Sequence, residues 1–221
     1  VENRIAADTT AVIDGGETPG SSTVTVGSDG AEVLATSNNT IEAVTAAGSV
    51  AVSLSGGSSL AISIGAGIAL NDIKGTTKAK LEDATITGSG PVTVKAEDIS
   101  KISATAAAAA FAAGGSPSSS IEVSGGGAFA FNTIATDVLA TILASTVNVT
   151  GGVTVEVHSK RDIDATILAA AFSLAISGST GVAAGFGVAV AENIIKGVSA
   201  DQSQVKASVS SSDITSSGAI E

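Results

Sequence analysis

The sequence contains no cysteine, methionine, tryptophan or tyrosine, and its only aromatic residues are five phenylalanines. The lack of cysteine excludes a disulfide framework, but it suits an extracellular bacterial protein as well as a cytosolic one. Without large aromatic side chains, the core must be filled by valine, isoleucine, leucine and many alanines. We therefore expect a thin core in which backbones approach closely.

Basic residues are also scarce, because 10 lysines and arginines against 21 acidic residues give a formal net charge of −11. Nucleic acid and anionic membranes would repel such a chain, so we predict neither as a partner. No uniformly apolar run reaches about 18 residues, and we expect a chain that is not membrane-embedded. Because it begins at Val1 and has no signal-peptide pattern, we expect a processed product or an excised piece.

What the sequence does have is a repeat of 61 residues. The segment ISATAAAAAFAAGGSPSSSIEVSGGGAFAFNTI (residues 102–134) recurs at this spacing, with copies that begin at Ile41, Ile102 and Ile163. We predict one repetitive β domain over residues 1–221, with a partial repeat at 1–40 and repeats at 41–101, 102–162 and 163–221.

Two irregularities interrupt the array. Residues 1–26 align with the next repeat at a shift of 68, which would place Val24-Thr25-Val26 on Val92-Thr93-Val94 and make residues 27–40 a surface loop. A second insertion, at residues 198–206, shifts the alignment between successive repeats by 6 residues. No polar capping unit is visible at either end, so we expect a segment of a longer array or a subunit whose ends its neighbours cover.

Within one repeat the pattern predicts strands. The alanine-rich run at 106–113 favours helix by propensity, but its equivalents contain Gly, Val, Thr and Ile and alternate with period two, so we predict a strand. A turn then reverses the chain at 55–59, 114–120 and 177–180. In the returning run a bulky face, including Leu60 and Ile64, alternates with a face of Gly and Ala. We expect both faces to be buried, while later strands have one solvated side.

Stacking of equivalent residues predicts an all-β fold, a β-solenoid of 61-residue repeats with in-register strands. Side-chain amides at a tight corner would form a hydrogen-bonded column; the alternative is that each asparagine only takes a left-handed turn. One wide coil with a long internal hairpin is favoured over three short coils or an antiparallel meander. The predicted structural ladder comprises Asn3, Asn71, Asn132, Asn193, Ile73, Ile134 and Ile195.

The motifs A-x-I and V-T-V and the runs GAGIALNDI, GGAFAFNTI and GVAVAENII resemble repeats of very large secreted bacterial surface proteins, the haemagglutinin-like or leukotoxin-like exoproteins and adhesins. The resemblance covers nearly the whole chain. It implies a secreted β-solenoidal stalk or fibre, extracellular or at the cell surface, with no catalytic residues to transfer.

Residues that could carry chemistry are few. One charged run could suggest a polysaccharide-cleaving or polysaccharide-binding β-helix, but its counterparts in other repeats differ, so we expect a charged coil corner; it comprises His158, Lys160, Arg161, Asp162 and Asp164. His158, the only histidine, is expected at the solvated surface. Oxygens of Asp14, Glu17 and Asp29 could bind calcium, although the β-roll signature is absent.

We therefore predict that the chain is not an enzyme and needs no cofactor. It is expected to be a structural segment of an extracellular fibre, stalk or adhesin. Its partners would be adjacent repeats of a longer chain or copies of itself joined head to tail into filaments, with cell-surface glycans as a further candidate. A competing binding-module hypothesis assigns the contacts to the two insertions, at 27–40 and 198–206.

Overall fold

The computed structural model describes residues 1–16, 22–198 and 204–221, and these residues form strands and turns without a helix. The strands are β1 (Glu2–Ala6), β2 (Thr9–Asp14), β3 (Ser22–Val26), β4 (Ala31–Leu54), β5 (Ser59–Glu82), β6 (Ala84–Gly88), β7 (Val92–Ser116), β8 (Ser119–Leu143), β9 (Thr146–Val149), β10 (Val153–Ser177), β11 (Thr180–Lys196), β12 (Val205–Ser210) and β13 (Asp213–Ser216). The all-β prediction is confirmed.

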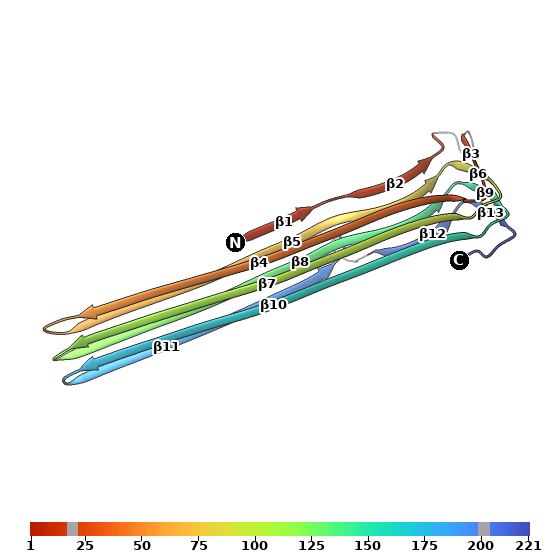
Figure 1. Ribbon diagram of the computed structural model, residues 1–221. Helices are drawn as coiled ribbons and strands as arrows, with labels where there is room; N and C mark the ends of the chain where they lie inside the picture. The colour runs from red at the N-terminus through yellow and green to blue at the C-terminus, as the bar shows by residue number, and fades with distance from the viewer. Residues whose placement is uncertain (17–21, 199–203) are drawn as a thin grey trace.

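The strands form three sheets in which every described pair is parallel (Figure 1). Sheet A has β5 and β8 at its centre with β1, β2, β11 and β12 beside them, sheet C has the order β4, β7, β10, and sheet B has the order β3, β6, β9, β13. Each repeat therefore runs out in sheet C, turns back in sheet A and finishes in sheet B. The alternatives of an antiparallel meander and of three short coils per repeat are wrong.

Like residues of successive repeats lie side by side. β4 pairs with β7, β7 with β10, β5 with β8 and β8 with β11, each at an offset of 61 residues. Ile41, Ile102 and Ile163 thus form one row across sheet C. The alanine-rich run lies inside β7, because its inward and outward positions must match those of the strands on either side.

The N-terminal part departs from the prediction. β1 and β2 pair with β5 at the expected shift of 68, but Val24 lies beside Ile86 in sheet B instead of Val92. The offset of 61 begins at Ala31, so the predicted surface loop at 27–40 is wrong, and most of it belongs to β4. The extra residues lie mainly between β2 and β3, partly outside the described residues. The predicted register rested on the identity of residues 24–26 with residues 92–94, and a match of three residues is too short to fix which strand they pair with.

Near the turns, sheets A and C pack through their small residues. We call this part, residues 43–69, 104–130 and 165–191, the blade. A β-carbon at Gly65 would lie 2.7 Å from the carbonyl oxygen of Ala109, and one at Gly126 would lie 2.4 Å from that of Ala170. The Gly/Ala face therefore lies inside, where only hydrogen side chains permit this backbone approach.

The bulky face of the blade points outward instead. Leu60 is 59% exposed and Ile64 is 74% exposed, whereas Ala69 on the opposite face is fully buried. The prediction that both faces are buried is therefore wrong for the described chain. The physical reason is that the glycine-containing inner face of sheet A and the alanine-rich inner face of sheet C lie too close together for branched side chains to fit between them.

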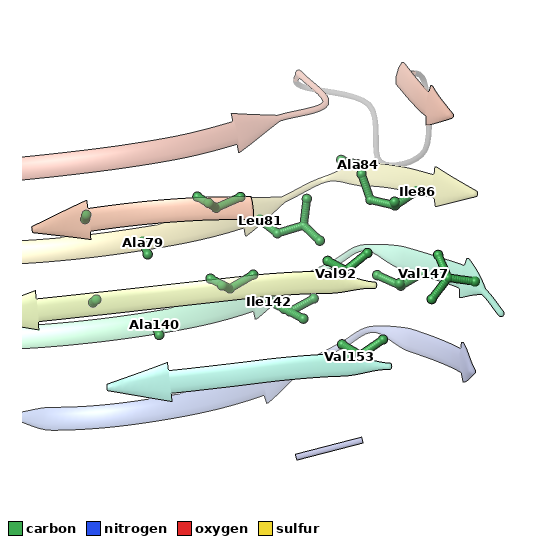
Figure 2. Close-up of a cluster of buried hydrophobic side chains, with 14 of the residues drawn as sticks. Ala79, Leu81, Ala84, Ile86, Val92, Ala140, Ile142, Val147 and Val153 are labelled. Carbon is green, nitrogen blue, oxygen red and sulfur yellow. The ribbon is translucent and has the colours of Figure 1, made fainter. Parts of the chain in front are cut away.

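At the other end of the strands, the three sheets enclose a hydrophobic core that contains valine, leucine and isoleucine side chains (Figure 2). Leu81, Ile86, Ile142 and Val147 are completely buried there. On the outer side of this region, Lys74, Lys78 and Lys80 alternate with buried residues, so the prediction of strands with one solvated side is confirmed.

In the three layers that end in β6, β9 and β13, the chain turns from sheet A into sheet B through a residue with a left-handed backbone. These residues are Asp83 (φ 53°), Ala144 (φ 48°) and Ser211 (φ 52°), and none is glycine. A left-handed conformation costs a residue with a β-carbon about 1 kcal/mol. The tight corners therefore occur here, and they carry some strain.

Replacing Ala144 by glycine should raise the free energy of unfolding by about 1 kcal/mol, because glycine adopts this φ without strain. The matched control is Ala140→Gly in β8, where the side chain is fully buried in a strand; it should lower stability by about 1 kcal/mol. Urea unfolding of both variants tests this, and a loss of stability at both positions would contradict it.

Candidate functional site

The four asparagines form one hydrogen-bonded column between sheets A and C. The Nδ2 atom of Asn3 donates to Oδ1 of Asn71, Asn71 donates to Asn132, and Asn132 donates to Asn193, each over 2.8 Å. Asn71 and Asn132 are buried. The column lies in the middle of the long strands, so its predicted position at a tight corner is wrong, and the left-handed residues of the corners are others.

Two residues further along, the isoleucines of the ladder pack in a parallel column. Ile73 and Ile134 are completely buried, whereas Ile195 in the edge strand β11 is 50% exposed. The same register that brings the amides together also stacks these side chains. The seven residues of the predicted ladder are thus adjacent in the structure.

A buried polar cluster, which the sequence did not suggest, lies between the sheets next to this ladder. Nε of Arg161 donates to Oγ1 of Thr136 over 2.8 Å, and Nη2 donates to the Thr136 carbonyl oxygen over 2.9 Å. Thr136 and Ser100 both donate to the carboxylate of Asp98, which is 1% exposed. The cluster separates the hydrophobic core of the blade from the core at the sheet B end.

Burial lowers the pKa of Arg161, while the carboxylates of Asp98 and Asp137 act to raise it. Because the guanidinium keeps its proton in any case, its charge is compensated by these carboxylates. Asp137 also accepts hydrogen bonds from the backbone of Val198 and Gln204, at 3.4 and 2.9 Å, and so holds both sides of the second insertion. These contacts indicate a structural role for the cluster.

A signal for this cluster existed in the sequence. Asp98 and Ser100 continue the inward parity of Val92, Val94 and Ala96, all of which are buried. Tracing the alternation beyond the apolar residues would have placed two polar side chains inside. What the sequence could not supply was their partners, because Thr136 lies in the facing sheet A and Arg161 lies in the next layer of sheet C.

The charged run around His158 does not converge on one point. His158, Lys160, Asp162 and Asp164 are exposed on the outer side of β10, whereas the guanidinium of Arg161 lies between the sheets. The run occupies the interior of a long strand, so the prediction of a charged coil corner is wrong. This arrangement does not bring the two aspartates together with Arg161 as an acid/base group.

Salt bridges in this region are partly exposed and weak. Nζ of Lys95 lies 3.8 Å from Glu97 and 3.9 Å from Glu156, and the imidazole of His158 contacts the Glu156 carboxylate. Solvent-exposed ion pairs of this kind contribute little to stability. They place mixed charge on the outer surface of sheet C, beside the apolar blade.

The candidate calcium ligands are dispersed. Oδ1 of Asp14 accepts the backbone N–H of Gly16 over 2.8 Å, and Asp29 accepts a hydrogen bond from Ser28 over 3.3 Å. Glu17 lies outside the described residues. Among the residues that are described, no group of three or more acidic or histidine side chains is suitably placed for a metal ion.

The blade holds one charged residue, Glu122, and its side chain is fully buried. Its Oε1 atom accepts hydrogen bonds from the hydroxyls of Ser120 and Ser59, at 2.5 and 3.3 Å, while Oε2 has no partner in the described chain. A β-carbon at Gly114 would collide with this carboxylate. The group is enclosed near the turn and does not open onto a cleft.

These features define an all-β protein of long parallel strands in stacked sheets, held by a central amide column. No family model, curated protein or solved structure matches the chain. No part of the described chain forms a helix that is long and apolar enough to cross a membrane. The resemblance to secreted bacterial surface proteins stays a prediction.

Proposed function

We propose that the chain is a non-enzymatic structural segment of an extracellular fibre, stalk or adhesin, built as a β-solenoid in which each repeat adds one coil. The observation that supports this most directly is the amide column, with its three equal hydrogen bonds through four layers. Because each layer offers the next layer the same contacts, the array can be extended without a change of fold.

The composition and the repeat motifs support a location and partners for such a segment. An acidic chain without cysteine suits a secreted bacterial protein, and the repeat motifs resemble those of cell-surface exoproteins. Adjacent repeats of a longer chain are the first partners that we propose, and cell-surface glycans are a further one. Catalysis has no part in the proposal, because the charged run on β10 is split between the inside and the outside.

The two ends of the column favour continued stacking. Oδ1 of Asn3 accepts no hydrogen bond and Nδ2 of Asn193 donates none within the described residues, so one end offers an acceptor and the other a donor. Ile195 is half exposed at the donor end. Another copy, or the next repeat of a longer chain, could therefore continue both columns. Open strand edges also favour such pairing.

A series of chains with added repeats tests this proposal. Inserting four further copies of residues 102–162 after Asp162 should lengthen the stack by about 19 Å and raise its stability. Small-angle X-ray scattering and urea unfolding measure the two effects. The control carries an insertion of the same composition in scrambled order, which should lengthen no axis and add no stability. If both chains behave alike, the repeats do not stack as coils.

Head-to-tail filaments are tested separately by electron microscopy of the purified chain at high concentration. Filaments whose long axis follows the stacking direction would support assembly through the open ends. Uniformly monomeric particles would remove self-assembly from the proposal and leave the extended single chain.

A further inference from the structure

The outer face of sheet C in the blade spans the same eleven positions of each strand, residues 44–54, 105–115 and 166–176. Six positions of each span point outward, and all of these residues are apolar except Thr105 and Thr166. The large side chains of this face are unprotected: Val50 is 73% exposed, Leu54 82% and Phe172 58%. At about 3.3 Å per residue and about 4.8 Å per strand, the face covers about 500 Å². An apolar patch of this size marks an interaction surface.

This face is corrugated along the stacking axis. Phe111 and Phe172 stack with ring centroids 5.5 Å apart and planes at 8°, and Val50 continues the same row, which we call the ridge. Beside it, Gly48, Ala109 and Ala170 form the floor of a groove of about 550 Å³. The groove lies two positions from the ridge in every layer.

We propose that this face binds the same face of a second copy, about a twofold axis parallel to the stacking direction. The axis would pass over Ser49, Ala110 and Ala171, which lie midway between groove and ridge and also at the centre of the eleven-residue span. The rotation then sets each ridge into the partner's groove and superposes the two apolar spans. A twofold axis along the strands would instead set ridge on ridge.

The arrangement buries no charge. The first charged residues beyond the apolar span, Glu42 and Asp164, would lie over the partner's turns, at the open margin of the interface. The two faces together amount to about 1,000 Å², near the lower limit for a specific interface, and the area grows with each added repeat. Lateral pairing thus strengthens as the array lengthens.

Hydrocarbon is a less suitable cover for this face. β4 and β10 are the edge strands of sheet C in the described chain, so wherever no adjacent repeat pairs with them their backbone N–H and C=O groups would lose water inside a lipid bilayer. A second copy covers the side chains and leaves those edges in water. The proposal does not depend on the ends of the stack, so it is independent of head-to-tail assembly.

The antiparallel register can be tested by cross-linking, because the chain has no cysteine of its own. In the dimer, Ser118 at the turn lies over the partner's Ser103, whereas each of these residues is about 45 Å or more from its own symmetry mate. A mixture of Ser103→Cys and Ser118→Cys chains treated with a short thiol cross-linker should give mixed dimers. Dimers of one variant alone, or no dimers, would overturn the register.

A charge in the groove should dissociate the pair. Ala109 is exposed in the single chain, so Ala109→Glu should fold normally and lower the dimer association constant by about 100-fold. The control is Ala66→Glu, at an equally exposed position on the outer face of sheet A; it should leave dimerisation unchanged. Sedimentation equilibrium across a wide concentration range, with circular dichroism for folding, measures both.

Three outcomes would overturn the proposal. The unmodified chain could remain monomeric at every concentration, or the two variants could weaken association equally. The chain could also bind phosphatidylcholine vesicles, with both substitutions weakening that binding; the apolar faces would then be covered by lipid and not by a second copy.

Discussion

Replacing Gly126 by alanine should lower the free energy of unfolding by about 3 kcal/mol or more. The new methyl group would lie 2.4 Å from the Ala170 carbonyl oxygen, and this neighbour is backbone in the facing sheet, which cannot rotate away. Relief requires the two sheets to separate, and separation weakens the packing of the blade in every layer. Urea unfolding followed by circular dichroism measures the effect.

The adjacent residue supplies the control. A β-carbon at Gly125 would meet only the Ile64 side chain at 4.0 Å, on the outer face, and its neighbours in the stack are Ile64 and Phe186. Gly125→Ala should therefore change stability by less than about 1 kcal/mol, with a gain expected from the lower entropy of the unfolded chain. Equal losses at both positions would show that the Gly/Ala face is not the one between the sheets.

Replacing Asn132 by aspartate should cost about 3 kcal/mol or more at neutral pH. The carboxylate can still accept the hydrogen bond from Asn71, but it cannot donate to Oδ1 of Asn193, which lies within hydrogen-bond distance of the lost donor. Two acceptors then face each other at a position that is 1% exposed. The amide column is interrupted at its centre.

The same substitution at the end of the column is the control. Asn193 accepts from Asn132 and donates to no described residue, and it is exposed in β11. Asn193→Asp keeps that acceptor and should cost less than about 1 kcal/mol. Chemical denaturation of the two variants at one pH compares them directly. If Asn132→Asp is as stable as Asn193→Asp, the column contributes little to the fold.

The substitutions at Gly126 and Asn132 test two different contacts of the fold. Gly126 concerns the distance between sheets A and C, whereas Asn132 concerns the bonds between layers along the stack. A lateral dimer and an extended stack need both to be intact. For this reason the tests of assembly use Ala109 and Ala66, whose side chains contribute neither to the sheet contact nor to the column.

The repeat of 61 residues could be found from the sequence because stacked layers require like residues at like positions. The same requirement placed Asn71 beside Asn132 and identified the strand at 106–113 despite its alanines. At the N-terminus this reasoning failed, since Val24 matches Val92 in β7 by sequence but pairs with Ile86 in the short strand β6. A period fixes which residues align only where the aligned pattern is long.

By itself, then, the sequence determined the all-β class, the period, the turns and the rows of equivalent residues, since these follow from local alternation and from similar residues that recur at a constant spacing. Only the tertiary structure decided which face of each strand lies inside, where the corners fall and which polar groups meet Arg161. Alternation separates the two faces of a strand but does not orient them. Their orientation depends on the distance between the sheets, which glycine backbones such as Gly65 and Gly126 set through contacts with another layer.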